Sequence, residues 1–168
     1  MLTWQIGFPT TTVFPASSVI NMGFVIKPLE PQLVDSVVRL EELCFSVPFK
    51  KQDILSYLEN PLWSFLVATH ENELLGYISY YVNFDECQIC NVAVFPECRG
   101  LGLGSALVEE MISQAKKRGA TKFFLEVRES NLSAIKLYEK CGFSRDGVSK
   151  NHYSKPLENA LLMSLILD

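Results

Sequence analysis

The sequence predicts one domain of the mixed α/β class, in which short strands alternate with amphipathic helices. Its 168 residues suit a single domain, and 48% apolar with 20% charged residues is ordinary for a globular protein. From Gly23 onward, strand-like and helix-like patterns follow one another without an internal repeat, a low-complexity tract or a linker. We therefore expect residues 23–168 to form one folded unit, preceded by an uncharged extension over residues 1–22.

The first half of this unit is expected to begin with a strand over 24–29. A helix over 31–45 follows, because Pro31 suits a first turn and four apolar side chains recur on one face, those of Leu33, Val37, Leu40 and Cys44. A shorter helix over 50–60 is closed by Asn60-Pro61. Two apolar runs then flank a polar turn at Glu71-Asn72, which predicts a hairpin, and a further strand ends before Pro96; these strands span 63–70, 73–83 and 87–95.

The second half is expected to open with a helix over 104–118. Its apolar positions recur every four residues and Gly119 suits its C-terminal cap; the four positions are Leu103, Leu107, Met111 and Ala115. A strand over 121–127 leads to a short helix over 131–142, and two strands over 143–150 and 159–167 complete the chain. The extension over 1–22 lacks the basic start and unbroken apolar core of a secretory signal, and Met22 is a candidate start. No apolar run approaches the roughly 18 residues of a membrane-spanning helix, so we expect no membrane association.

Charge and cysteine content narrow the class of partner. Residues 1–98 hold 4 Lys/Arg against 11 Asp/Glu, whereas residues 99–168 hold 11 against 8, and the net charge is −4. This balance argues against direct nucleic-acid binding and suits an anionic ligand in the second half. Five cysteines without a dense framework indicate a reducing, cytoplasmic setting. Cys87 and Cys90 form a lone Cys-x-x-Cys in an extended run, where they point to opposite faces, so we expect no metal site.

The stretch Arg99–Gly104, RGLGLG, lies between the predicted strand 87–95 and the helix that follows. It is not the Gly-x-Gly-x-x-Gly of dinucleotide-binding proteins, because Ser105 and Leu107 stand where the third glycine is required in the two registers. No Gly-Lys-Ser/Thr of a P-loop is present either. Arg-x-x-Gly-x-Gly before a helix still offers free backbone amides and close approach to a phosphate. The alternative is a glycine-rich turn that binds nothing.

A second cluster of candidate residues follows in LEVRESNLSAIKLYEKCGF, residues 125–143. Glu126 lies near the end of a strand, Asn131 opens the next helix, and Tyr138 shares a helical face with Asn131. Alone, each has a structural explanation: a solvated glutamate, a helix N-cap and a packed tyrosine. Together, a strand-end carboxylate and a helical tyrosine can converge on one ligand.

These two stretches carry a family resemblance, dense over residues 91–143 and weaker from Gly23 to the C-terminus. NVAVFPECRGLGLGSALVEE followed by LEVRESNLSAIKLYEKCGF resembles the acetyl-CoA-binding core of the GNAT N-acetyltransferase superfamily. The second stretch resembles most the RimI-type enzymes, which act on the N-terminal alanine of a small-subunit ribosomal protein. The resemblance implies a GNAT fold, with a mixed, mostly antiparallel, twisted sheet of six to seven strands and about four helices. It also implies acetyl-CoA as co-substrate and a protein N-terminus as acceptor.

The resemblance further implies a role for each matching residue. Glu126 is the general base for the amine and Tyr138 the acid that protonates the departing sulfur, while Tyr153 lines the substrate mouth. Cofactor-binding positions are Val92, Ala93, Val94, Arg99, Gly100, Leu101, Gly102, Leu103, Gly104 and Asn131.

The chain departs from the RimI-type pattern in two segments near the expected acceptor groove. Lys150 and His152 replace Arg and Tyr in one segment, and Phe49 and Lys50 replace Trp and Ser in the other. These departures leave open a small-molecule amine or a protein lysine as acceptor. A non-catalytic acetyl-CoA-binding regulatory module is the alternative of another class, and the presence of both Glu126 and Tyr138 argues against it.

Overall fold

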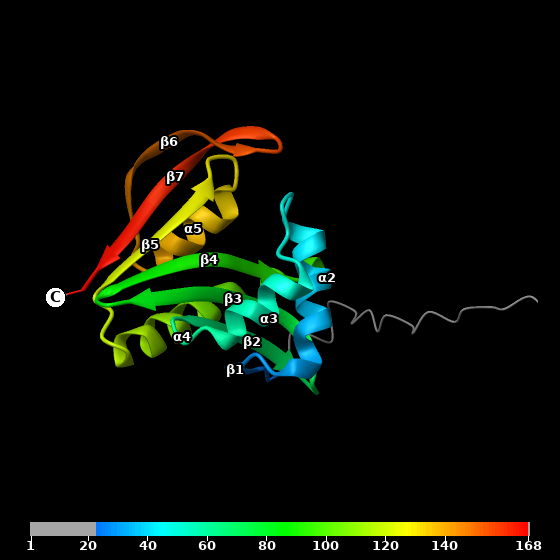
Figure 1. Cartoon of the computed structure of the whole chain (residues 1–168). Coiled ribbons are helices and arrows are strands. Elements are labelled where there is room, and N and C mark those ends of the chain that lie inside the picture. Colours follow the sequence, from blue (N-terminus) through cyan, green and yellow to red (C-terminus); the bar gives the residue numbers. More distant parts are fainter. Residues whose placement is uncertain (1–22, 168) are drawn as a thin grey trace, which may run out of the picture.

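The structure is a computed structural model that describes residues 23–167. The expected extension over 1–22, with Met22, lies outside the described residues. Figure 1 shows the chain as a single twisted sheet with helices on both faces.

Seven strands form the sheet, in the order β1-β2-β3-β4-β5-β7-β6. They span β1 Val25–Pro28, β2 Trp63–His70, β3 Glu73–Asn83, β4 Glu86–Val94, β5 Lys122–Arg128, β6 Ser144–Ser154 and β7 Leu157–Ile166. Neighbouring strands are antiparallel except β4 and β5, which run parallel. The expected mixed, mostly antiparallel sheet is thus confirmed, and the last strand pair is longer than its sequence pattern indicated.

Four α-helices and two short 3₁₀ turns complete the fold. They are η1 Pro31–Leu33, α2 Val34–Cys44, α3 Lys51–Glu59, η2 Pro96–Cys98, α4 Leu103–Lys117 and α5 Leu132–Lys140. The helix expected over 31–45 therefore begins with a 3₁₀ turn at Pro31, whose fixed φ suits that position. Helices α2 and α3 cover one face of the sheet, and α4 and α5 cover the other (Figure 1).

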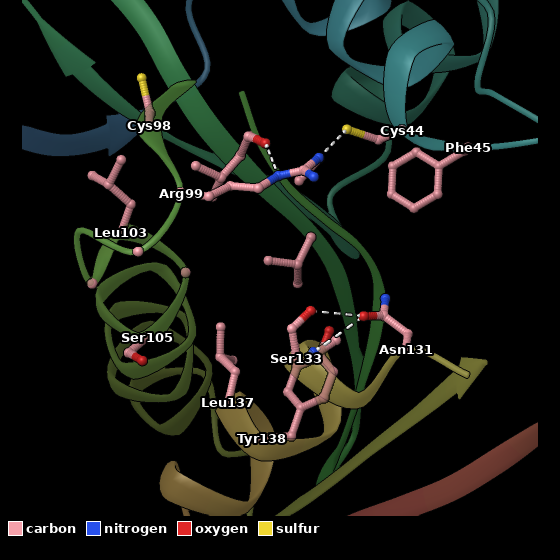
Figure 2. Close-up of a pocket in the computed structure, with 17 residues that line it drawn as sticks. Cys44, Phe45, Cys98, Arg99, Leu103, Ser105, Asn131, Ser133, Leu137 and Tyr138 are labelled. Carbon is pink, nitrogen blue, oxygen red and sulfur yellow. Dashed lines mark hydrogen bonds between the residues drawn. The ribbon is translucent and has the colours of Figure 1, made fainter. Parts of the chain in front are cut away.

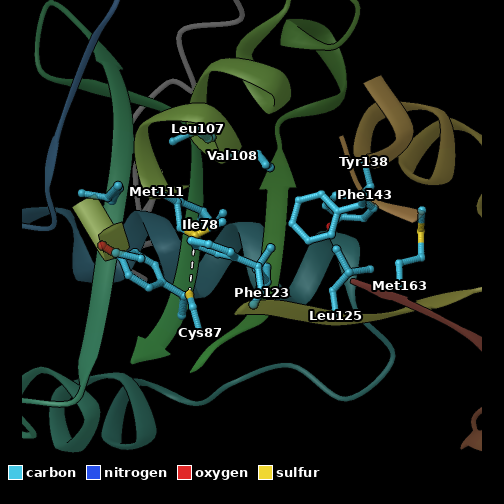
Figure 3. Close-up of a cluster of buried hydrophobic side chains, with 14 of the residues drawn as sticks. Ile78, Cys87, Leu107, Val108, Met111, Phe123, Leu125, Tyr138, Phe143 and Met163 are labelled. Carbon is cyan, nitrogen blue, oxygen red and sulfur yellow. Dashed lines mark hydrogen bonds between the residues drawn. The ribbon is translucent and has the colours of Figure 1, made fainter. Parts of the chain in front are cut away.

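The main hydrophobic core lies between the sheet and helices α4 and α5. The apolar stripe of α4 is buried there as its four-residue spacing predicts, with Leu107, Met111 and Ala115 fully enclosed. Figure 3 shows Leu107 and Met111 in one cluster with Phe123 of β5 and Ile78 of β3. A second cluster lies under α2 and α3 and includes most of the apolar residues of α2.

Cys87 and Cys90 lie in different surroundings, as the strand periodicity indicated. Cys87 packs in the main core, where its Sγ lies 3.7 Å from the Sδ of Met111 (Figure 3). Cys90 lines a cavity on the other side of β4. Burial raises the pKa of both thiols to about 12, which disfavours the thiolate that metal binding and redox chemistry need.

The parallel strands β4 and β5 meet at one end and diverge toward the other (Figure 1). Their ladder covers only Glu86–Gln88 against Lys122–Phe124. On the opposite edge of β4, the register with β3 shifts, so that Asn91 faces Ser79 while Ile89 faces Tyr80. Cys90 is the extra residue of this β-bulge, and a bulge bends the strand that contains it. The bulge therefore leaves backbone groups of β4 beyond Gln88 unpaired with β5, facing the space between the two strands.

Candidate active site

A cavity of about 550 Å³ opens where β4 and β5 diverge. Its walls come from the end of β4, the loop that precedes α4, the first turn of α4, and α5 (Figure 2). Nearly all residues expected to bind the cofactor line it: Val92, Ala93, Val94, Arg99, Gly100, Gly102, Leu103, Gly104 and Asn131. Leu101 differs, because its side chain packs against the main hydrophobic core.

Two glycines of the RGLGLG loop are required by its backbone geometry. Gly100 and Gly102 adopt φ of +79° and +81°, which L-residues with a Cβ rarely adopt, and no atom lies within 4 Å of a Cβ placed on either. Gly102 is the N-cap of α4, so the amides that begin the helix lack intrahelical partners. The loop thus presents free N–H groups and the positive end of the helix dipole to the cavity, as an anionic phosphate requires.

Arg99 crosses the top of this cavity (Figure 2). Its Nε donates to the carbonyl oxygen of Val94 at 3.1 Å, and its Nη2 lies 3.4 Å from the Sγ of Cys44 on α2. The guanidinium therefore connects the glycine loop to both β4 and α2.

Asn131 is the N-cap of α5 and also lines the cavity. Its Oδ1 caps α5 by accepting from the backbone N–H of Ala134 at 3.2 Å and from the Ser133 hydroxyl at 3.0 Å. Because the oxygen is used by the cap, the side-chain NH₂ is the group available to the cavity that Asn131 lines.

A second cavity of about 410 Å³ lies on the other side of the divergent strands. It is bounded by the loop between α2 and α3, the end of β5, and the β6–β7 hairpin. Glu126 and Tyr153, expected at the reacting amine and at the substrate mouth, both line it. The two cavities share six lining residues, which are Cys44, Phe45, Val92, Asn131, Ala134 and Tyr138.

Tyr138 extends from α5 into the region where the cavities meet (Figure 2). Only 7% of it is exposed, and its ring packs edge-on against Phe143 at 5.9 Å between centroids. Burial, and to a lesser degree the neighbouring Tyr153, raise the pKa of the Tyr138 phenol well above its ordinary value. The hydroxyl is therefore protonated at neutral pH, as a proton donor must be.

Glu126 lies on β5 beyond the part of the strand that pairs with β4. It is exposed, and its Oε2 accepts from the side-chain amide of Gln88 at 3.2 Å. The structure thus brings Glu126 and Tyr138 to one cavity from a strand and a helix, as the sequence pattern indicated.

One buried carboxylate was not anticipated from the sequence. Glu41 of α2 has no exposed surface and accepts three hydrogen bonds, from the Tyr77 hydroxyl, from Asn91 Nδ2 at 2.7 Å and from the Phe49 N–H at 2.6 Å. Burial raises the pKa of Glu41 to about 6, although the bonds from Phe49 and Asn91 oppose the shift. Its position four residues after Val37, on the apolar face of α2, was the available signal.

Two further features of residues 23–167 bear on function. Within this range, no group of three or more His, Cys, Asp or Glu side chains is arranged to hold a metal ion. None of the helices described is both long and apolar enough to cross a membrane.

Comparisons with known proteins agree with this architecture. Residues 34–143 match the acetyltransferase (GNAT) family. The chain is 40% identical over 105 residues to the ribosomal protein bS18-alanine N-acetyltransferase of Haemophilus influenzae, covering 61% of this chain and 71% of that protein. It is 31% identical over 142 residues to the Escherichia coli K12 enzyme of the same name, covering 83% and 95%.

Solved structures show the same fold. The crystal structure of the ribosomal-protein-S18-alanine N-acetyltransferase from Escherichia coli superposes with a TM-score of 0.78 at 29% identity, over 87% of this chain and 95% of that one. Ard1 from Thermoplasma volcanium gives a TM-score of 0.79 at 29% identity, over 86% and 98%. With its family match, its close relatives and its divergent parallel strands, the chain belongs to the GNAT family of N-acetyltransferases.

Proposed function

We propose that this acetyltransferase moves the acetyl group of acetyl-CoA to the N-terminal amine of a protein, and that the acceptor residue is the N-terminal alanine of ribosomal protein bS18. The observation that carries the proposal is the pair of cavities that meet at Val92 and Tyr138. One cavity has the features of a phosphate and pantetheine site, and the other contains a carboxylate. A reaction between two substrates needs such an arrangement, because holding both in place lowers the barrier by several kcal/mol.

The 550 Å³ cavity fits acetyl-CoA, which supplies a thioester with an electrophilic acyl carbon. The free amides of the loop Arg99–Gly104 would hold the pyrophosphate, at the N-terminus of α4. The β4 residues Val92–Val94 would pair with the pantetheine arm through backbone groups that β5 leaves unpaired. The NH₂ of Asn131 would donate to the same arm.

The backbone of β4 would also polarise the thioester carbonyl. An N–H of the Val92–Val94 segment that points into the gap donates to the carbonyl oxygen as negative charge develops there. The segment is held in place by its pairing with β3 and by the bulge at Cys90. Such a preorganised donor stabilises the transition state more than the bound substrate.

Glu126 is the proposed base for the attacking amine. An N-terminal amine has a pKa near 8 and is mostly protonated at neutral pH, so it must lose a proton before its nitrogen attacks the acyl carbon. The Glu126 side chain lines the 410 Å³ cavity, the proposed acceptor cavity. Its carboxylate would take that proton, directly or through a water molecule. Its negative charge also favours the entry of a cationic amine.

Tyr138 is the proposed acid. When the carbon–sulfur bond breaks, the departing thiolate needs a proton, and the Tyr138 hydroxyl at the junction of the cavities is positioned to give it. The raised pKa of Tyr138 keeps the proton on the phenol until that moment. The same dry surroundings also make the thiolate more basic, so the pKa values of the donor and of the acceptor shift in the same direction.

The identity of the acceptor is supported by the relatives and by the second cavity. Both relatives compared above are enzymes of bS18 alanine acetylation. Of the four residues that depart from the RimI-type pattern, only His152 lines the acceptor cavity. Phe49 instead packs against Tyr57 and Trp63, on the side of α3. Three of the four departures therefore lie outside the lining of this cavity.

A thiol-release assay tests the proposal. The full chain is supplied with acetyl-CoA and a short peptide that has the N-terminal sequence of bS18, and the same peptide with a blocked N-terminus is the control. We expect release only with the free amine, and mass spectrometry should place one acetyl group on the first residue. Release with a lysine-containing blocked peptide or a small polyamine, but not with the free N-terminus, would overturn the acceptor assignment.

A further inference from the structure

Arg128 is the last residue of β5 and lies between two walls of the 410 Å³ cavity. One wall is the loop after α2, and the other is the β6–β7 hairpin. The side chain of Arg128 is mostly buried, with 22% exposed, although it carries a full charge.

The guanidinium of Arg128 bonds to both walls. Toward the loop, Nη2 donates to the Oγ of Ser46 at 3.1 Å. Toward the hairpin, Nη2 donates to the carbonyl oxygen of Lys155 at 2.9 Å. Nη1 donates to the carbonyl oxygen of Pro156 at 3.2 Å and pairs with the Glu158 carboxylate at 2.9 Å. One side chain thus connects two segments that are far apart in the sequence.

Arg128 also contacts an aromatic residue that lines the cavity. Its Cζ lies 4.1 Å from the centre of the Tyr153 ring, within the range of a cation–π contact. The planar guanidinium stacks and hydrogen bonds at once, which a lysine ammonium cannot do with the same geometry.

The terminal nitrogens of Arg128 have four N–H groups, and the protein supplies four acceptors for them. The Glu158 carboxylate balances the charge. Because these donors are committed to the protein, Arg128 is not suited to bind an anionic group of a substrate. Its contacts instead suit a role in holding the shape of the 410 Å³ cavity.

We propose that Arg128 is a positioning residue that fixes the distance between the loop at Ser46 and the hairpin at Tyr153, and so sets the affinity for the acceptor. This inference rests on the proposed function, because it takes the 410 Å³ cavity as the acceptor site. Arg128 lines this cavity, but the N–H groups of its terminal nitrogens are used by the protein, so its effect reaches the reaction through the walls it holds.

The test is the variant Arg128→Lys, which keeps the charge and loses the planar fork. We expect the KM for the peptide to rise about tenfold, the size of one lost charged hydrogen bond. The KM for acetyl-CoA should change less than twofold, because the 550 Å³ cavity does not include Arg128. The kcat at saturating peptide should also stay within about threefold of the unchanged chain, since Glu126 and Tyr138 are retained.

Arg118→Lys is the matched control. Arg118 also donates to a serine hydroxyl, that of Ser64. It donates as well to two backbone carbonyl oxygens, those of Pro61 and Leu62. It lines neither of the two cavities. A loss of affinity in Arg128→Lys that Arg118→Lys does not share therefore depends on the cavity walls and not on a general loss of stability.

Ser46→Ala supplies a second, milder variant in case Arg128→Lys does not fold. It removes only the hydrogen bond between Arg128 and the loop, and should raise the KM for the peptide by several fold. Where Arg128→Lys folds, the double variant should have a KM for the peptide close to that of Arg128→Lys alone. An unchanged KM for the peptide in both variants, or an equal rise for peptide and acetyl-CoA, would overturn the inference. Failure of the unchanged chain to acetylate any N-terminal peptide would instead overturn the proposed function.

Discussion

The Tyr138 hydroxyl lies at the junction of the two cavities. Replacing Tyr138 with phenylalanine removes this hydroxyl and keeps the ring. We predict that Tyr138→Phe lowers kcat about 100-fold, the usual scale of general acid catalysis. The dissociation constant for acetyl-CoA should stay within about twofold, because the ring that packs against Phe143 is kept. Steady-state kinetics and calorimetric titration measure the two quantities. Tyr57→Phe, outside both cavities, is the control, and a normal kcat in Tyr138→Phe would remove the residue as the acid.

Glu126 acts on the amine and not on the thioester, so its removal should have a different pH signature. We predict that Glu126→Gln lowers the rate most at pH 7, where the amine is mostly protonated and needs a base. The loss should shrink toward pH 9, above the amine pKa of about 8, because the nucleophile is then already neutral. A pH–rate profile of both proteins measures this, with Glu129→Gln as control. A loss that is constant over this range contradicts the role of Glu126 as base.

At the level of residues, the sequence predicted those that stand in ordered motifs and missed those that act through distant contacts. Glu126, Asn131, Tyr138 and the RGLGLG loop line the cavities as expected, except for Leu101 of the loop, which packs against the core. Glu41 and Arg128 were not anticipated, because their partners lie 8 to 50 and 27 to 82 positions away in the chain. Local pattern contains no information on which distant donor or acceptor a buried charge will find.

At the level of elements, the helices and strands were predictable because each has a clean periodicity and a capping or turn residue. The bulge at Cys90 and the divergence of β4 from β5 were not. Both depend on the register that β4 adopts with β3, which is set by packing on two faces of the sheet. The space proposed for the reaction therefore arises from pairing between strands and not from any one strand.

The loop between α2 and α3 is fastened to the sheet through Glu41. All three partners of its carboxylate are donors, so the ionised side chain can satisfy them and a glutamine cannot. Ser46 and Phe45 of this loop line the acceptor cavity. The conformation of the loop thus depends on a carboxylate whose ionisation is opposed by burial.

This opposition predicts a specific dependence of stability on pH. The pKa of Glu41 rises from 4.5 in the unfolded chain to about 6 in the folded one, so the folded state binds more protons between these values. The contribution of Glu41 to the free energy of unfolding therefore falls as the pH rises through this window. Between pH 5 and pH 7 the fall is about 1 kcal/mol for this group.

The variant Glu41→Gln should remove that contribution. We predict that it destabilises the protein by about 1–3 kcal/mol at pH 5, because a donor loses its acceptor, and by about 1 kcal/mol less at pH 7. Urea unfolding of both proteins at the two pH values measures the difference. Glu42→Gln, the exposed neighbour, should show no such change with pH. A loss of stability that is larger at pH 7 than at pH 5 contradicts the direction of the shift.

At the level of the whole molecule, the divergence of β4 and β5 raises the question of whether the two parts of the sheet unfold separately. Their ladder is short, yet the main hydrophobic core continues across it. Ile78 and Ile89, before the gap, belong to the same cluster as Phe123, Leu125 and Met163 beyond it. Side chains of α4 and α5 belong to this cluster as well. The core therefore compensates for the backbone pairing that the cavity removes.

A continuous core predicts one cooperative transition for the described part of the chain, and acetyl-CoA should shift it as a whole. At a concentration 100 times its dissociation constant, a ligand that binds only the folded state adds about 2.7 kcal/mol to the free energy of unfolding. For a protein of this size, this corresponds to a rise in Tm of roughly 5–10 °C. Thermal unfolding followed by near-UV and far-UV circular dichroism measures it, and the two signals should coincide with and without the ligand. If acetyl-CoA moved one signal and left the other in place, unfolding would pass through an intermediate, and the prediction of one cooperative transition would be wrong.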